Sequence, residues 1–88
     1  MTQYQRGANF EREVKKYLEE MGYYVMRSAG SKGLADLIAL KKGKTLLIQC
    51  KISGDISPKE FNAFTDLGRK LGVSTTLAKK VKGKVVFF

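Results

Sequence analysis

The sequence predicts an α/β fold in which helices flank a central mixed sheet of five strands, in the order α-β-β-β-α-β-β. Three observations lead to this prediction. They are an amphipathic pattern near the N-terminus, two strand-like segments joined by a lysine- and glycine-containing turn, and a second helix pattern followed by two short strands. With 88 residues, the chain is expected to form a single domain over residues 1–88.

The first helix is expected over residues 6–21, where apolar residues recur at helical spacing and Gly22 follows as a stop. The β-branched and aromatic residues 23–27 predict a first strand. The glycine- and serine-rich residues 28–33 predict a loop that offers N–H groups, hydroxyls and cations to a phosphate. The apolar residues of the helix are Phe10, Val14, Tyr17, Leu18 and Met21.

The segments 33–40 and 46–51, joined by a turn over residues 41–44, predict a hairpin that carries polar residues among apolar ones. If the turn is centred in this loop, opposing residues have numbers that sum to 85, so Asp36 faces Gln49. Such residues lie about 4.5 to 5.5 Å apart at Cβ.

Lys51 follows Gln49 by two residues and is therefore expected on the same face of its strand. An acid, an amide and an amine thus converge at one end of the hairpin. Cys50 points to the apolar side, where we interpret it as a small core residue rather than a thiol nucleophile.

The second helix has a well-marked start, because Ser57 is a typical N-cap, Pro58 suits the first helical position and Glu60 completes a capping box. Two further strands are expected over residues 74–79 and 84–88. The apolar stripe of this helix consists of Phe61, Phe64, Leu67 and Leu71.

The composition points to a polyanionic partner. Seventeen Lys and Arg residues against eight Asp and Glu give a formal net charge of +9, which favours nucleic acid over a merely solvated basic surface. The absence of histidine excludes a histidine-based triad or general base. No apolar run is long enough to cross a membrane, and the single Cys50 suits a reducing, intracellular compartment.

The polar residues of the hairpin are candidate ligands of a hard divalent cation. Asp36, Gln49 and the Cys50 carbonyl supply oxygen atoms, and Glu11, on the border of the first helix's apolar stripe, is placed to reach inward. Lys51 would orient a metal-activated water or stabilise charge on a phosphodiester. Taken one by one, these residues could also be a turn cap, an exposed strand amide, a strand-end charge and a solvated helix carboxylate.

Four ordered motifs resemble the archaeal-type Holliday junction resolvases of the PD-(D/E)xK nuclease superfamily, whose fold is restriction-endonuclease-like. The resemblance covers nearly the whole chain. The motifs are Arg6-Gly7 through Phe10-Glu11-Arg12, Arg27-Ser28-Ala29-Gly30-Ser31-Lys32, Ala35-Asp36-Leu37-Ile38-Ala39 and Ile48-Gln49-Cys50-Lys51.

This resemblance implies a homodimer that cuts a four-way DNA junction with Mg²⁺, for which Mn²⁺ can substitute. It assigns Glu11 and Asp36 to the metal site, Lys51 to catalysis, and a catalytic serine to the loop, where Ser31 and Ser28 are rivals. The implied DNA contacts are Arg6, Arg12, Arg27, Ser28 and Lys32. The candidate dimer contacts are Phe61, Phe64 and Leu67, for which a role in the core is the alternative.

Gln49 departs from the resolvase pattern, which has glutamate at this position, and resembles the Gln-x-Lys form of Mrr-type restriction endonuclease domains. Two alternatives to a junction resolvase therefore stay open. One is a related nuclease for flap, nicked or modified DNA, and the other is a catalytically silent, basic DNA-binding module. So compact a nuclease would suit a virus or a mobile element.

Overall fold

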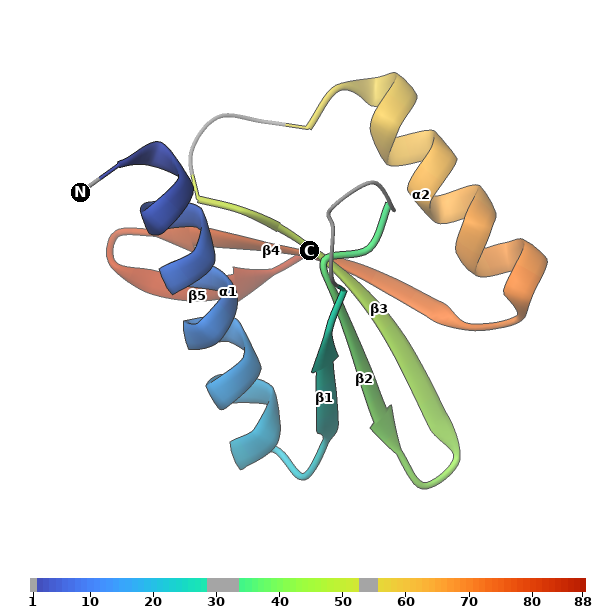
Figure 1. The fold of residues 1–88 in the computed structure, drawn as a ribbon. Helices are drawn as coiled ribbons and strands as arrows, with labels where there is room; N and C mark the ends of the chain where they lie inside the picture. Colours follow the sequence, from blue (N-terminus) through green and yellow to red (C-terminus); the bar gives the residue numbers. More distant parts are fainter. Residues whose placement is uncertain (1, 29–33, 53–55) are drawn as a thin grey trace.

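The computed structural model describes residues 2–28, 34–52 and 56–88, and its elements follow the predicted order (Figure 1). Neither of the two described helices is long and apolar enough to span a membrane. The elements are α1 (Gln3–Glu20), β1 (Tyr24–Arg27), β2 (Leu37–Lys41), β3 (Lys44–Lys51), α2 (Pro58–Leu71), β4 (Ser74–Val81) and β5 (Lys84–Phe87).

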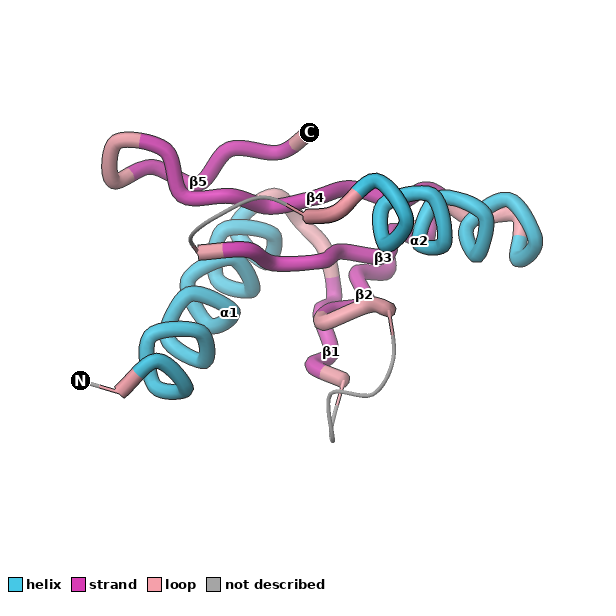
Figure 2. The backbone as a smooth tube through the Cα atoms, turned by 90° about the horizontal axis from the view of Figure 1, so that it is seen from above, coloured by secondary structure: helices cyan, strands magenta, loops and turns pink. Residues whose placement is uncertain are grey.

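The five strands form one mixed sheet in the order β1-β2-β3-β4-β5, which confirms the predicted fold class. Neighbouring strands are antiparallel except β3 and β4, which run parallel and are connected through α2. A parallel pair needs such a crossover, because its second strand must start at the same end as the first. Figures 1 and 2 show the sheet lying between the two helices.

The main core lies between α1 and one face of the sheet. Strand residues alternate between faces, so every second residue of the central strands points toward this helix. Val14, Leu37, Ala39 and Ile48 are completely inaccessible to solvent there. The rest of this core consists of Phe10, Leu18, Val25 and Ala78, with Tyr23, Leu46, Cys50, Ile52, Val85 and Phe87 packed against it.

On the other face, α2 lies close to β4. Gly68 makes this approach possible, because a Cβ atom there would lie 2.5 Å from Thr75 Cγ2 and 3.0 Å from the Val73 carbonyl oxygen. Phe64 is 1% exposed, so within this chain it follows the core alternative and not the dimer expectation. Phe61, in contrast, is 43% exposed.

Both helix starts are capped by side chains. Ser57 accepts a hydrogen bond from the Glu60 N–H at 3.2 Å, as predicted. The first helix begins earlier than predicted, because Thr2 and Gln5 form a capping box around its first turn. Strand β4 extends to Val81, two residues beyond the predicted end, because Val81 still pairs with Lys84.

The close approach at Gly68 can be tested by Gly68→Ala. We expect this change to lower the free energy of unfolding by about 1–3 kcal/mol, since the added methyl group would overlap Thr75. Gly7→Ala is the matched control, because no described atom lies within 4 Å of a Cβ there and alanine favours a helix by about 1 kcal/mol. Urea unfolding followed by circular dichroism measures both, and a Gly68→Ala protein as stable as the wild type would contradict the packing argument.

Candidate functional site

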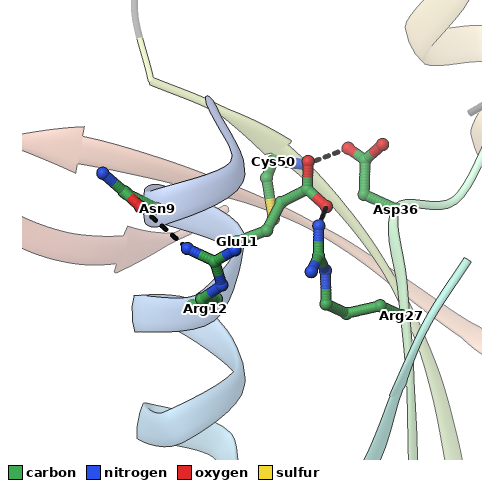
Figure 3. Close-up of polar contacts among 6 residues, drawn as sticks. All are labelled: Asn9, Glu11, Arg12, Arg27, Asp36 and Cys50. Atoms are coloured by element: carbon green, nitrogen blue, oxygen red, sulfur yellow. Dashed lines mark hydrogen bonds and ion pairs between the residues drawn. The ribbon is translucent and has the colours of Figure 1, made fainter. Parts of the chain in front are cut away.

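Polar groups gather where three strands end. The last residue of β1 is Arg27, β2 starts directly after Asp36, and β3 ends just beyond Cys50. Glu11 reaches this point from α1, so the four residues come together from four segments of the chain (Figure 3).

The contact that organises the cluster forms where the ladder between β2 and β3 stops. The last paired residues are Leu37 and Ile48, and the Asp36 N–H still donates to the Ile48 carbonyl at 2.8 Å. Beyond this point the Asp36 carboxylate replaces the neighbouring strand, because its Oδ2 accepts a hydrogen bond from the Cys50 N–H at 2.8 Å. Since the N–H and C=O of a strand residue point to the same side, the Cys50 carbonyl is also directed toward Asp36.

The predicted hairpin register is confirmed within the strands, where Leu40 pairs with Thr45. The prediction was wrong about Asp36, which precedes β2 and is not a strand partner of Gln49. The reason is that its side chain contacts the main chain of β3 instead of projecting from a paired position. Gln49 and Lys51 keep their common strand face, opposite that of Cys50, which packs against the core beneath α1.

Glu11 lies between a cation and a second acid. Its Oε1 is 3.5 Å from Arg27 Nη2, and its side chain is 24% exposed. Burial raises the pKa of the Glu11 carboxyl above its usual value, and the negative charge of Asp36 raises it further, whereas Arg27 lowers it. Two carboxylates therefore approach each other in a partly buried place, which favours a cation between them.

Gln49 contributes a buried amide oxygen near the end of β3. None of the residues that the structure describes donates a hydrogen bond to its buried Oε1. A buried acceptor without a donor costs about 1–3 kcal/mol, so a group that binds this oxygen is expected.

Lys51 is the last residue of β3 and is half-buried beside Lys79 of the neighbouring parallel strand. The Lys79 ammonium lies 5.9 Å from the centre of the Phe88 ring. Two lysines in one row give this end of the sheet a positive potential, which suits contact with a phosphate.

The thiol of Cys50 is not a nucleophile in this setting. Burial raises its pKa above the usual value, and the negative charges of Asp36 and Glu11 raise it further. The thiol stays protonated at neutral pH and packs as a small apolar group, as the sequence predicted.

Among the predicted DNA-contacting residues that the structure describes, Arg27 belongs to the cluster and Ser28 is bonded to Asp36. Arg6 and Arg12 are exposed on α1, and Arg12 Nη1 donates to Asn9 Oδ1 at 2.9 Å. The Ser28 N–H donates to the Asp36 carbonyl at 2.9 Å, which ties the end of β1 to the start of β2. Ser31 and Lys32 lie outside the described residues.

The oxygen donors fit a hard divalent cation. Such an ion accepts carboxylate, amide and carbonyl oxygens and keeps several waters, so a few protein ligands suffice. Within residues 2–28, 34–52 and 56–88, no three His, Cys, Asp or Glu side chains gather into a metal site. The acids that meet here are the Glu11 and Asp36 carboxylates, beside the Cys50 main chain, and Gln49 lies one residue before Cys50 on the other face of β3.

Sequence reasoning missed two ion pairs, because their partners are far apart in the chain. One joins Glu11 to Arg27, and the other joins Glu13 Oε2 to Lys80 Nζ at 3.2 Å. No periodicity connects residues at such separations, so only the fold identifies these partners.

Comparisons with known proteins agree with this geometry. A model of the archaeal Holliday junction resolvase family, Hjc, matches residues 2–88. The crossover junction endodeoxyribonuclease Hjc of Methanocaldococcus jannaschii is 40% identical over an alignment of 88 positions, and the match covers 96% of this chain and 65% of that protein's length. The solved structure of Archaeoglobus fulgidus Hjc, a Holliday junction resolvase from an archaeal hyperthermophile, matches with a TM-score of 0.79 and 25% identity over 94% of this chain and 71% of that chain.

The bond between Asp36 and Cys50 can be tested by comparing two substitutions. Asp36→Ala leaves the Cys50 N–H without its acceptor, so we expect unfolding in urea to show a loss of about 1–3 kcal/mol. Asp36→Asn keeps an oxygen acceptor and should lose clearly less. Amide hydrogen exchange at Cys50 should be faster in the alanine variant, and equal exchange in both variants would contradict the assigned bond.

Proposed function

The chain belongs to the archaeal Holliday junction resolvase family, and on this basis we propose that it is a metal-dependent endodeoxyribonuclease that cuts four-way DNA junctions. The observation that carries the proposal is the meeting of Glu11, Asp36 and the Cys50 main chain at the strand ends, one residue from Lys51. We propose that it acts inside the cell, where branched DNA forms and a lone thiol stays reduced.

Membership of this family implies a divalent metal ion, and we propose Mg²⁺, with Mn²⁺ able to substitute. Asp36, the Cys50 carbonyl and Gln49 would hold it, with Glu11 as a direct or water-mediated ligand. Two arguments support these ligands. The carboxylates of Glu11 and Asp36 repel each other without a cation, and the buried Gln49 Oε1 lacks a donor among the described residues. When bound, the ion would activate water and screen the negative phosphodiester.

Three residues of the chain would contact the phosphate or position the groups of the site. The Lys51 ammonium would contact the scissile phosphate and stabilise its growing negative charge. Arg27 pairs with Glu11 at 3.5 Å and would hold that carboxylate toward the cluster. Asp36 fixes the end of β3 through the Cys50 N–H, which keeps Lys51 at a constant distance from the acids.

The proposed substrate also fits the charge and the exposed surface. A net charge of +9 favours binding to phosphate backbones. The proposed DNA contacts are Arg6 and Arg12 on α1, Arg27 at the end of β1, and Ser28, Ser31 and Lys32, which follow it in sequence.

Paired cuts in a junction need two sites, so we propose a homodimer. Phe61, which is 43% exposed, and the half-buried Leu67, both on α2, would contribute to the interface. Exposed apolar side chains also lie on the sheet face opposite α1, where Tyr24 is 68% and Met26 41% exposed. Apolar surface of this kind is typical of subunit contacts.

The proposed activity can be tested with a synthetic four-way junction in Mg²⁺ or Mn²⁺. We expect paired nicks from the wild type and a loss of at least about a thousandfold in Asp36→Asn and Lys51→Ala, because each removes a group acting on the reacting phosphate. Persistent cleavage by Asp36→Asn would contradict the mechanism. Flap, nicked and linear duplexes at equal concentration are the controls for substrate, and faster cutting of any of them would favour the related-nuclease alternative.

The role of Gln49 is tested by calorimetry with Mn²⁺. We expect Gln49→Glu to bind the ion more tightly than the wild type, by about tenfold, since a carboxylate adds a charge to the ligand set. Asp36→Asn, which removes a charge, should bind more weakly than either. If neither the wild type nor Gln49→Glu binds Mn²⁺ while junction affinity still falls steeply with salt, the silent DNA-binding module is the better description.

A further inference from the structure

Two hairpin turns of this chain have the same sequence, Lys-Gly-Lys. Residues 42–44 connect β2 to β3, and residues 82–84 connect β4 to β5. The glycines have nearly the same conformation, with φ values of 76° at Gly43 and 78° at Gly83. The lysines of both turns are exposed. The turns differ in backbone conformation, because Lys82 has a φ of 51° whereas Lys42 is not among the residues with positive φ. Residue type and exposure therefore do not distinguish them as partners for a phosphate.

The sheet topology places them at opposite ends of the molecule. The candidate site lies at the C-terminal end of β3. Residues 42–44 precede and begin this strand, so they lie at the end of β3 that is far from the site. Strand β4 runs parallel to β3 with Lys79 beside Lys51, so it continues past the site toward residues 82–84 (Figure 1). Only this second turn extends from the end of the sheet that carries the candidate site.

A groove is lined by residues that lie close in sequence to this turn and to the candidate site. Lys80 lies in the groove, and its Nζ is 3.2 Å from Glu13 Oε2, with 37% and 42% of the two side chains exposed. Ile52, which directly follows Lys51, also lines it. The complete lining is Arg6, Asn9, Phe10, Glu13, Ile52 and Lys80.

Two basic residues, Arg6 and Lys80, line this groove, and Lys82 and Lys84 follow Lys80 in the turn. We call Arg6, Lys80, Lys82 and Lys84 the hairpin surface, and the carboxylate paired within it is Glu13. Clustered like charges repel each other, and a polyanion that lies across them relieves this repulsion. Duplex DNA is a suitable partner for several neighbouring cations, because it presents about one negative charge per 1.7 Å of axis.

We propose that the hairpin surface binds the phosphate backbone of a duplex arm that leaves the cleavage site, on the side away from Arg27. This inference rests on the proposed function. It adds the β4–β5 turn to the DNA-contacting surface and leaves the chemically identical β2–β3 turn out of it. Glu13 limits the contact, since it competes with DNA phosphates for Lys80.

The test is junction affinity in EDTA as a function of salt. Lys82→Gln/Lys84→Gln should bind about tenfold more weakly, and the slope of log affinity against log salt should fall by about 1.8, or about 0.9 for each lost contact. Lys42→Gln/Lys44→Gln removes the same charge from a turn with the same Lys-Gly-Lys sequence and should bind like the wild type. Equal effects of the two double variants, or no effect of the first, would overturn the proposal.

A second substitution tests the same surface by an expected gain in junction affinity instead of a loss. Glu13→Gln frees Lys80 and should tighten junction binding about threefold, whereas Glu19→Gln, on the same helix far from the groove, should not. Weaker binding by Glu13→Gln would contradict the role of Lys80. Failure of the proposed function is a separate result, because it would appear as a wild type that does not cut the junction in Mg²⁺.

Discussion

The hydrogen bond from the Cys50 N–H to the Asp36 carboxylate is the constraint on which the candidate site depends. A strand whose neighbour stops has an unpaired edge, and the exposed N–H needs an acceptor. Here a side chain supplies it at 2.8 Å. The same bond fixes the position of an acid, directs the Cys50 carbonyl toward that acid and ends the ladder beyond Ile48. A backbone requirement and a ligand requirement are thus met by one carboxylate.

This arrangement has an electrostatic cost that the fold only partly offsets. Glu11 and Asp36 are close enough that each disfavours the charge of the other, and burial adds to the effect on the pKa of Glu11. Arg27 is the only cation with a defined contact to Glu11 in the described part of the chain, and it is itself 39% exposed. An exposed ion pair contributes about 0–1 kcal/mol, too little to compensate two partly buried acids. The cluster therefore favours binding of a further cation.

Sequence patterns predicted the parts of this structure that depend on neighbours in the chain. The caps of α2, the hairpin register and the placement of Cys50 in the core all follow from spacing and residue type. The position of Asp36 did not, because alternation assumes a continuing ladder and the side chain ends that ladder. The ion pair between Glu13 and Lys80 was also missed, since 67 residues separate the partners. The loop residues Ser31 and Lys32 lie outside the described ranges, so their proposed roles remain predictions.

The two Lys-Gly-Lys turns show how topology gives different surroundings to the same local sequence. The difference depends on α2, which returns the chain so that β4 runs parallel to β3. Gly68 lets α2 pack closely on β4 after this crossover, because a Cβ atom there would overlap Thr75. The crossover through α2 therefore places Lys79 beside Lys51. The chemistry of the site is set by Asp36 and its neighbours, whereas the extent of the basic surface around it is set by the packing of a helix on the opposite face.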